Sequence, residues 1–498
     1  MTTAPPPRSA LAVLLAGTFM ASLDTAIVNV AGPAIQADVG VSGAALQLVI
    51  SGYALAYAAL LITGARLGDD HGHRRLFLAG LAGFTIMSLL AGLAWTTPVL
   101  VAARIGQGVA AAAMGPQVMT VIQLQYDGAA RMKAMALLAT VVSAGVVAGQ
   151  VLGGALVDLD LLGASWRPVF LINVPVGLAL LAIGPRLLPV TRRPSGRRMD
   201  WLGVALTGDI ITLVMVPLVF GHEVGWAWWT WACLGAAVPT AGALALHLRR
   251  TVARGGAPVA DVRLLAAPRF GLGMASTTAV MIAYGGFLFT LTLHLQQGLG
   301  DSPLRAGLTF APYAVGFAIT SLTVPALAPR AGRLLAPLGL ALSAAGYLGL
   351  GAVAGGGTWS DAEALPLLAL AGAGFGAGYS QVITRSIAGV APAQAHDASG
   401  LFNTINMLGF ALGVATLGSA FLSAVGAPTA SETGSAFALV ADGCGALSLA
   451  GVGCVLALAR AEDRSAAAAA QLSGVNASSA SVRDTAPVIA ATTSSASG

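Results

Sequence analysis

Long apolar segments follow one another along most of the chain, separated by Gly, Pro or charged residues. They cover residues 11–31, 45–65, 76–94, 98–121, 134–157, 169–188, 202–221, 228–248, 271–295, 305–327, 335–354, 365–386, 400–423 and 436–458. Each is near the roughly 20 residues that cross a bilayer as a helix. A membrane β-barrel would instead alternate apolar and polar residues in segments of about ten. The pattern therefore predicts an all-α, polytopic membrane protein with fourteen transmembrane helices.

The composition agrees with this fold class. The chain has 498 residues, of which 56% are hydrophobic and 9% charged, whereas a soluble domain has about 25% charged residues. A secreted enzyme, a nucleic-acid-binding protein and a disordered protein are excluded, and the lipid bilayer is the expected surrounding. The first apolar segment is long enough to span, so we expect a retained helix and not a cleaved signal peptide.

The basic residues predict an orientation. Of the 25 Lys and Arg residues, all but Arg104, Arg167 and Arg305 lie in the N-terminus, the loops after even-numbered helices or the C-terminal segment. Positively charged loops stay on the cytoplasmic side of a membrane. All tryptophans except Trp201 cluster at the opposite helix ends, where an interfacial aromatic belt belongs. Both termini are therefore predicted to be cytoplasmic.

The loops divide the chain into parts. Basic connections at 186–200 and 249–269 set off the seventh and eighth helices, and similar segments at 67–73 and 327–333 follow the second and tenth helices. Two six-helix halves with a substrate site between them are typical of transporters. We expect an N-terminal bundle (1–190), two inserted linker helices (191–265), a C-terminal bundle (266–465) and a disordered cytoplasmic tail (466–498), which is rich in Ala, Ser and Thr.

Two opposite charges are expected at one depth in the membrane. Asp24 is about seven residues from the outer end of the first helix, and Arg104 about six from the outer end of the fourth. At 1.5 Å per residue both lie about 10 Å below the outer surface. Gln107, one turn after Arg104, is placed to hydrogen-bond the same carboxylate. The pair is either a static buried ion pair or a proton site, and a membrane acid facing a cavity favours the proton site.

Two further features have both a functional and a structural interpretation. Asp209 is an intramembrane acid and a possible second proton site, although its helix belongs to the inserted pair. In the fifth helix Gly145, Gly149, Gly153 and Gly154 form a stripe of small residues that lets another helix approach closely. The stripe is either ordinary packing or a sliding seal between the two halves.

The loop after the second helix contains Asp69, Gly72 and Arg74. An acid beside helix N-termini and arginines can close the cytoplasmic face as a gate, and the alternative is a plain positive anchor. The chain has no histidines at metal-ligand spacing, no C-x-x-C pair, no Ser/His/Asp set, no phosphate-binding loop and no dinucleotide motif. We therefore expect neither an enzyme nor a bound metal or cofactor.

Four segments carry a resemblance to a known family. They are LDTAIVNVAGP at 23–33, RIGQG at 104–108, WRPVFLINVPVG at 166–177, and LQQ at 295–297 with Pro303 and Gly307. In order and spacing, from about residue 10 to 460, the chain resembles the major facilitator superfamily, specifically its fourteen-helix drug:proton antiporter branch. The resemblance implies that Arg104 belongs to the family's proton-coupling motif.

The chain departs from the family pattern at a few positions. In the loop motif, Ala65 replaces a Gly, while Asp70 and His73 each replace an Arg. In the fifth helix Gln150 stands where the antiporter motif has Pro, so that helix is expected to be straighter. Gln150 is also expected level with Asp24 and within reach of its network.

The resemblance implies proton-driven export of a small amphiphilic compound, such as an antibiotic, across the bacterial inner membrane by alternating access. Protonation of Asp24 would release Arg104 and favour one orientation. The partners are then a small-molecule substrate and protons, with no nucleic acid and no obligate protein partner. An importer or metabolite symporter on the same scaffold is the alternative. A non-transporting membrane sensor would need a folded output domain.

Overall fold

The computed structural model describes residues 8–190, 200–254, 256, 263–356, 359–387, 390 and 395–484. These residues form helices and connecting turns, with no strand among them. The helices are α1 (Arg8–Val39), α2 (Gly43–His71), α3 (His73–Gly92), α4 (Thr97–Gln125), α5 (Gly128–Asp158), η1 (Leu161–Gly163), α6 (Pro168–Leu171), α7 (Asn173–Leu187), α8 (Trp201–Phe220), α9 (Trp228–Ala253), α10 (Arg263–Ala266), α11 (Pro268–Leu293), η2 (His294–Gly298), α12 (Pro303–Gly355), α13 (Asp361–Ile387), α14 (Ala395–Ala424) and α15 (Ala430–Asp484).

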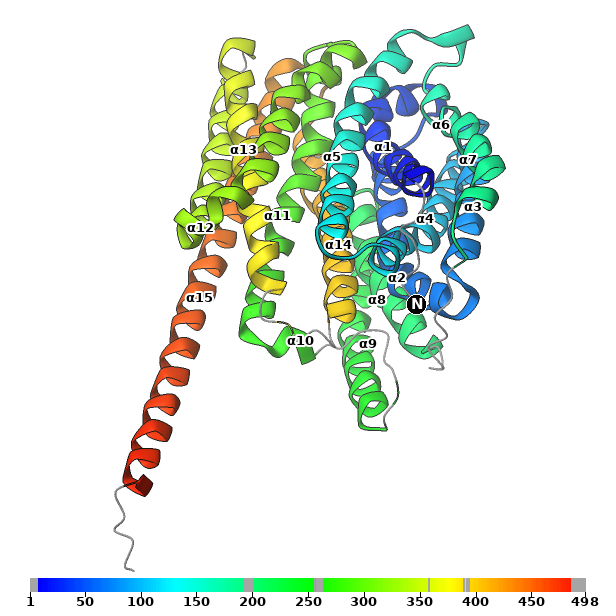
Figure 1. The fold of residues 1–498 in the computed structure, drawn as a ribbon. Coiled ribbons are helices and arrows are strands. Elements are labelled where there is room, and N and C mark those ends of the chain that lie inside the picture. The colour runs from blue at the N-terminus through cyan, green and yellow to red at the C-terminus, as the bar shows by residue number, and fades with distance from the viewer. Residues whose placement is uncertain are drawn as a thin grey trace, which may run out of the picture.

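Within the described residues, fourteen helical segments are long and apolar enough to cross a membrane. They match the fourteen segments predicted from the sequence, which confirms the all-α polytopic fold. Two of them, Pro303–Val324 and Arg333–Gly355, belong to α12. The helices stand side by side, and α15 continues beyond the bundle at the lower left of Figure 1. We call the end of the bundle with Arg8 and Gly72 the terminal end, and the end with Gly40 and Trp166 the far end.

The predicted sixth helix is broken near its start. Pro175 has no N–H group to donate to the carbonyl of Leu171, which is where α6 ends. The chain resumes a helical course at Asn173, the first residue of α7. This break lies beside the site described below.

Close helix packing builds each half of the bundle. In the first half α2 packs against α4 and α1 against α5, and in the second half α11 packs against α14 and α12 against α13. A side chain at Gly64 would collide with the backbone of Ala112, and one at Gly413 with the backbone of Ile282. Glycine is needed at these crossings because the backbones themselves are in contact. The inserted helices α8 and α9 pack on each other, and α8 also contacts α2 and α14.

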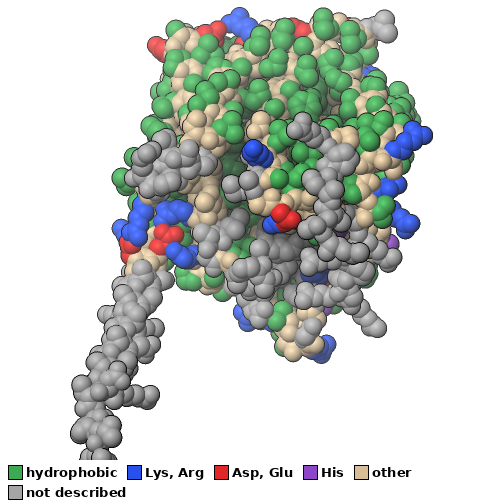
Figure 2. Space-filling view, viewed as in Figure 1, with side chains coloured by type: hydrophobic (Ala, Val, Ile, Leu, Met, Phe, Trp, Pro, Cys, Tyr) green, Lys and Arg blue, Asp and Glu red, His purple; other side chains and the backbone are tan. Residues whose placement is uncertain are grey.

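The surface between the two ends is apolar. Large side chains such as Ile86, Leu178 and Val238 are 59%, 57% and 73% exposed. Figure 2 shows hydrophobic side chains over most of the visible face, and a cluster of acidic and basic side chains at its lower left, where α15 leaves the bundle. On α15 itself, Glu462 Oε2 lies 2.5 Å from Arg385 Nη2 of α13. An apolar belt with charges at its rim is what a bilayer requires.

The tail differs from the sequence expectation. Disorder was expected over 466–498, but α15 continues through this segment as far as Asp484. The stretch contains a run of alanines at 466–470, and alanine has the highest helix propensity, so the membrane helix can continue beyond the bundle. Residues 485–498, and the basic residues of the first linker at 191–199, lie outside the described residues.

Candidate functional site

Asp24 and Arg104 meet in the interior of the first half. Arg104 Nη1 on α4 donates to Asp24 Oδ2 on α1 at 2.6 Å. The Asp24 side chain is 0% exposed and that of Arg104 1%. The structure therefore brings together the two charges that the sequence places at one depth. A buried ion pair needs further hydrogen bonds to offset the loss of water around both charges.

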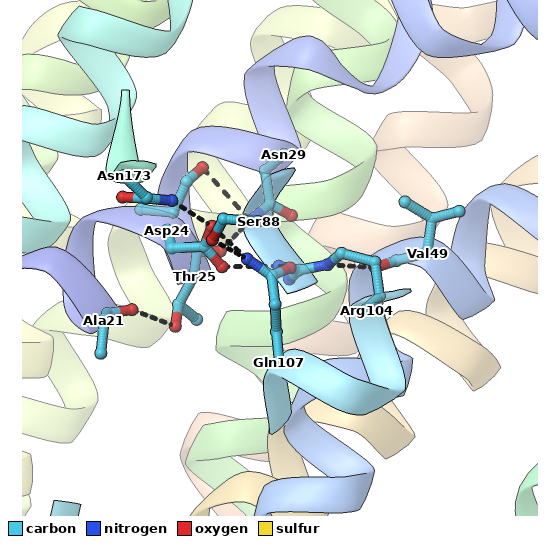
Figure 3. A network of polar contacts seen from close by, with 10 residues as sticks. Ala21, Asp24, Thr25, Asn29, Val49, Ser88, Arg104, Gln107 and Asn173 are labelled. Carbon is cyan, nitrogen blue, oxygen red and sulfur yellow. Dashed lines mark hydrogen bonds and ion pairs between the residues drawn. The ribbon is translucent and has the colours of Figure 1, made fainter. Parts of the chain in front are cut away.

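Amide groups supply those hydrogen bonds to Asp24 (Figure 3). Gln107 Nε2 donates to Asp24 Oδ1 at 3.1 Å, and Asn173 Nδ2 donates to the same oxygen at 2.8 Å. The Gln107 amide also donates to Ser88 Oγ at 2.8 Å and accepts from Arg104 Nη1 at 2.9 Å. Gln107 therefore belongs to the Asp24 network, as expected, and α1, α3, α4 and α7 all contribute side chains to it.

The guanidinium of Arg104 has partners other than Asp24. Its Nε donates to the backbone oxygen of Val49 at 2.9 Å. Its Cζ lies 4.9 Å from the centre of the Tyr53 ring and 5.8 Å from that of Phe170, and a cation over an aromatic face is electrostatically favoured. Arg104 would consequently keep a favourable environment if the carboxylate lost its charge.

Sequence reasoning missed Asn173, Ser88 and the ring of Tyr53. Asn173 is a single polar residue in an otherwise apolar run at the start of α7. A buried amide in a membrane helix requires a partner, so its chemistry was visible in the sequence. The direction in which the Asn173 side chain points could not be predicted from the sequence, because it depends on the helix break next to Pro175.

The glycine stripe of α5 faces two different neighbours. Side chains at Gly145, Gly149 and Gly153 would meet α1, at 2.8 Å from Ser22 Cβ, 2.6 Å from Leu23 O and 2.9 Å from Ile27 O. A side chain at Gly154 would meet Pro303 and Leu304 of α12. Three of the four glycines thus pack α5 within its own half, and Gly154 lies where the two halves touch.

Gln150 does not join the Asp24 network. Its Nε2 donates to the backbone oxygen of Ala26 at 3.5 Å, and its side chain is 2% exposed. Its own backbone oxygen lies 2.5 Å from where a side chain at Gly307 would begin. Gln150 is therefore near the depth of Asp24, as expected, and takes part in the crossing of α5 over α12.

Asp209 is separate from this site. It lies on α8 with an exposed side chain. The hydrogen bonds and ion pair of Asp24 come from Arg104, Gln107 and Asn173, and Asp209 shares none of them.

The residues of the expected gate lie where α2 meets α3. Asp69 Oδ1 lies 3.5 Å from His73 Nε2. Gly72 links α2 to α3 with φ +96, a conformation that side chains rarely adopt. Arg74 is half-buried on α3, and in the described part of the chain no ion pair joins it to Asp69.

Contacts between the two halves are concentrated at the far end. Gln296 Nε2 donates to Val30 O at 2.8 Å and Gln297 Nε2 to Gln36 Oε1 at 2.9 Å, which joins η2 to the last third of α1. The crossing of α5 over α12 near Gly154 is also at this end. On the α2 and α14 pair, contacts extend further, to Thr404 Oγ1, which donates to Ala58 O at 3.3 Å, and to Ile62, which lies against Gly400. The structure is therefore closed at the far end.

Aromatic rings stack in the second half. Tyr284 of α11 lies 5.2 Å from Phe375 of α13 with 14° between the ring planes, and Phe375 lies 5.3 Å from Tyr379 at 13°. Tyr379 Oη donates to Asn406 Oδ1 of α14 at 2.7 Å. Tyr284 and Tyr379 are partly exposed. We call Tyr284, Phe375 and Tyr379 the aromatic row.

No group of three or more His, Cys, Asp or Glu side chains placed to bind a metal ion occurs in the part of the chain that the structure describes. The three cysteines, Cys233, Cys444 and Cys454, are free thiols.

Comparisons with known proteins converge on transporters. The family model described as Major Facilitator Superfamily matches residues 14–414. A probable actinorhodin transporter of Streptomyces coelicolor is 37% identical over 432 residues, which cover 85% of this chain and 74% of the relative. The cephamycin export protein CmcT of Amycolatopsis lactamdurans is 35% identical, covering 82% and 84%. The multidrug efflux pump LfrA of Mycolicibacterium smegmatis is 34% identical, covering 84% and 82%.

Solved structures show the same fold at low identity. A proton-dependent oligopeptide transporter superposes with a TM-score of 0.68 at 15% identity, over 92% of this chain and 100% of the other. A bacterial homologue of the human lysosomal transporter Spinster superposes with a TM-score of 0.62 at 19% identity, over 91% and 95%.

Proposed function

The chain belongs to the major facilitator superfamily, and on this premise we propose that it exports a small amphiphilic compound of the antibiotic or drug class in exchange for protons. The relatives reported above are named for actinorhodin transport, cephamycin export and multidrug efflux, which supports drug efflux. Coupling to protons and alternating access are the further parts of the proposal, together with placement in a bacterial inner membrane.

The arrangement around Asp24 is the observation that carries proton coupling. The carboxylate is 0% exposed and receives hydrogen bonds from Arg104, Gln107 and Asn173. Binding a proton removes its charge and weakens all three bonds at once, because hydrogen bonds to an ionised acceptor are the stronger ones. Arg104 keeps Val49 O and the Tyr53 ring as partners. Both protonation states therefore have a stable environment, as a proton switch requires.

Orientation of the chain sets the direction of proton flow. The basic loops of the terminal end favour the cytoplasm for that end, so the far end faces outward and is closed in this structure. In the proposed cycle, protonation of Asp24 from outside loosens α1 from α4 and biases the two halves toward one arrangement. Each proton that crosses a potential of 100 mV contributes about 2.3 kcal/mol.

The aromatic row is the proposed contact surface for the substrate. Tyr284 and Tyr379 are partly exposed residues, and the Phe375 ring lies between their rings. Stacked aromatic faces bind planar apolar bodies well, and the Tyr379 hydroxyl adds a polar group beside Asn406. Few acids lie in the membrane spans, so we propose neutral or weakly charged substrates over dications.

Inverted membrane vesicles test the function. We expect vesicles with an acidified interior to accumulate a fluorescent aromatic drug, and vesicles containing Asp24→Asn to accumulate none at equal protein content. Discharge of preloaded drug on acidification would instead identify an importer or symporter. Accumulation that is unchanged when the proton gradient is collapsed would contradict proton coupling.

A further inference from the structure

A second buried polar cluster lies at the terminal end, away from Asp24. Its centre is His73, the first residue of α3, whose side chain is 0% exposed. His73 Nδ1 lies 2.8 Å from Gln117 Oε1 of α4. His73 Nε2 lies 3.5 Å from Asp69 Oδ1 of α2, and the Asp69 side chain is 26% exposed. One imidazole ring thus connects three helices.

The amide of Gln117 determines which ring nitrogen of His73 carries hydrogen. Gln117 Nε2 is bonded to the backbone oxygens of Gly64 at 2.9 Å and Ala113 at 3.1 Å. Both oxygens only accept, so the NH₂ group of the amide must face them and its oxygen must face His73. Because that oxygen also only accepts, His73 Nδ1 is the donor.

The state of Nε2 then follows. In a neutral imidazole with hydrogen on Nδ1, Nε2 is an acceptor. Here it would face the Asp69 carboxylate, a second acceptor, and Nε2 has no hydrogen-bond donor in the described structure. A proton on Nε2 turns this opposed pair into an ion pair. Imidazole is ordinarily a stronger base than a carboxylate, so the proton belongs on the ring.

We propose that His73 and Asp69 form a second proton-binding site, in which the bound proton makes His73 an imidazolium between Asp69 and Gln117. The other ionisable groups on this end of the packed elements are Arg66, Asp70 and His71 on α2, Arg74 and Arg75 on α3, and Arg186 on α7, which packs against α3. The only ionisable side chain of α4 is Arg104, which belongs to the Asp24 network. Asp69, whose Oδ1 lies 3.5 Å from His73 Nε2, is the acid placed to compensate the charge on the ring.

This site connects to the contact between the two halves. The segment of α2 that Gln117 holds at Gly64 is adjacent to Ile62, which lies 3.1 Å from where a side chain at Gly400 of α14 would begin. The imidazolium on α3 attracts Asp69, which lies further along α2 at the terminal end. Losing the proton removes this attraction and leaves the bond from Gln117 to Gly64 O as the remaining tie of this part of α2 to α4.

Nitrogen NMR of the full chain, labelled with ¹⁵N-histidine and held in lipid nanodiscs at pH 7.5, tests the protonation state directly. The His73→Gln variant identifies the His73 signals. We expect both ring nitrogens of His73 to carry hydrogen in the wild type. In Asp69→Asn we expect Nε2 to lose its proton while Nδ1 keeps the one donated to Gln117. The matched control His71→Gln removes a neighbouring exposed ring and leaves the His73 signals unchanged.

A neutral His73 ring in the wild type would overturn the proposal, as would an imidazolium that survives in Asp69→Asn. The Asp24→Asn variant should leave the His73 signals in place, and their loss would show one shared site instead of two. This result does not depend on any substrate, so it can fail while drug export stands.

The charge itself can be tested with two substitutions of His73. Arginine keeps a fixed cation beside Asp69, whereas glutamine has none. We expect the wild type to have a higher melting temperature than His73→Gln at pH 6, and this difference to disappear as the pH rises to 9. The higher melting temperature of His73→Arg relative to His73→Gln should persist over the same range. Equal pH profiles for the wild type and His73→Gln would contradict a proton on this ring.

Discussion

Arg104 Nη1 lies 2.6 Å from Asp24 Oδ2, although 80 residues separate the two in sequence. Each member of the pair also has partners of its own. Two side-chain amides donate hydrogen bonds to Asp24. Arg104 donates to a backbone oxygen and lies over an aromatic ring. A pair whose members are both satisfied independently can be neutralised without leaving a bare buried group. The proposed role of Asp24 as a proton switch depends on this property.

The first prediction concerns Asp24→Asn. Asparagine keeps the shape and can still accept a hydrogen bond from Arg104, so we expect normal folding but loss of proton-driven transport. Drug exchange between equal concentrations on both sides of the membrane should continue. The measurement is uptake into inverted vesicles with and without a proton gradient.

Asp209→Asn is the matched control, because it makes the same chemical change at an exposed position on α8. We expect it to leave coupled transport within about twofold of the wild type, since surface substitutions away from a network have small effects. Full coupled transport by Asp24→Asn would assign Asp24 to a purely structural role.

The second prediction is that Arg104→Lys fails to substitute for arginine. The planar guanidinium reaches Val49 O through Nε and Asp24 through Nη1 at the same time, and an ammonium group cannot reproduce this geometry. Losing one hydrogen bond to a charged group costs about 1.5–3 kcal/mol, so we expect coupled transport to fall about tenfold or more. Transport rates in proteoliposomes at matched protein density decide the point. Rates equal to the wild type would show that charge alone is sufficient.

The third prediction concerns Asn173→Ala. Asn173 donates to the ionised form of Asp24, so its removal makes the neutral carboxyl relatively more favourable. We expect the pH profile of transport to shift toward higher pH, with the maximal rate largely kept. Asn29→Ala is the matched control, because Asn29 is also buried on α1 but bonds to Thr25 O. The same shift in both variants would contradict a direct effect on Asp24.

The depth of this site in the membrane could be predicted from the sequence, but the directions of its side chains could be predicted only in part. Counting residues along a helix gives depth, because the rise per residue is fixed. Depth placed Asp24, Arg104 and Gln107 together correctly. It also placed Gln150 near Asp24, but Gln150 bonds to Ala26 O instead. Which way a side chain points depends on how each helix is rotated by its packing, which linear spacing does not contain.

Two other features of the site could not be predicted from the sequence, each for a local physical reason. Asn173 was missed because the segment 169–188 has the pattern of one continuous helix. In the structure the helix is interrupted between α6 and α7, next to Pro175. The stripe from Gly145 to Gly154 signals a close neighbour without identifying it. The structure places α1 beside most of the stripe and α12 beside its last residue. Small residues permit contact, and the tertiary fold selects the partner.

The fourth prediction concerns Glu223 in the turn between the inserted helices. Glu223 Oε1 accepts from Ala44 N at 2.9 Å and Oε2 from Ser42 Oγ at 3.2 Å, so it caps the start of α2. We expect Glu223→Ala to lower stability by about 1 kcal/mol, as loss of a helix cap does. The neighbouring exposed residue His222 gives the control His222→Ala, which should leave the melting temperature unchanged. An equal effect of both variants would mean that the cap contributes nothing.

The fifth prediction is that a side chain at Gly154 prevents closure of the far end. A Cβ there would collide with Pro303 and Leu304 of α12, so Gly154→Val should hold α5 and α12 apart. Gln36 and Gln297 report closure, because their amides are 2.9 Å apart when the far end is shut. With cysteines at 36 and 297, we expect oxidative crosslinking to fall at least several-fold in Gly154→Val. Gly235→Val on α9 is the matched control, since nothing lies within 4 Å of a Cβ at that position. Crosslinking that is equally efficient in Gly154→Val and the control would show that the halves close without the contact at Gly154.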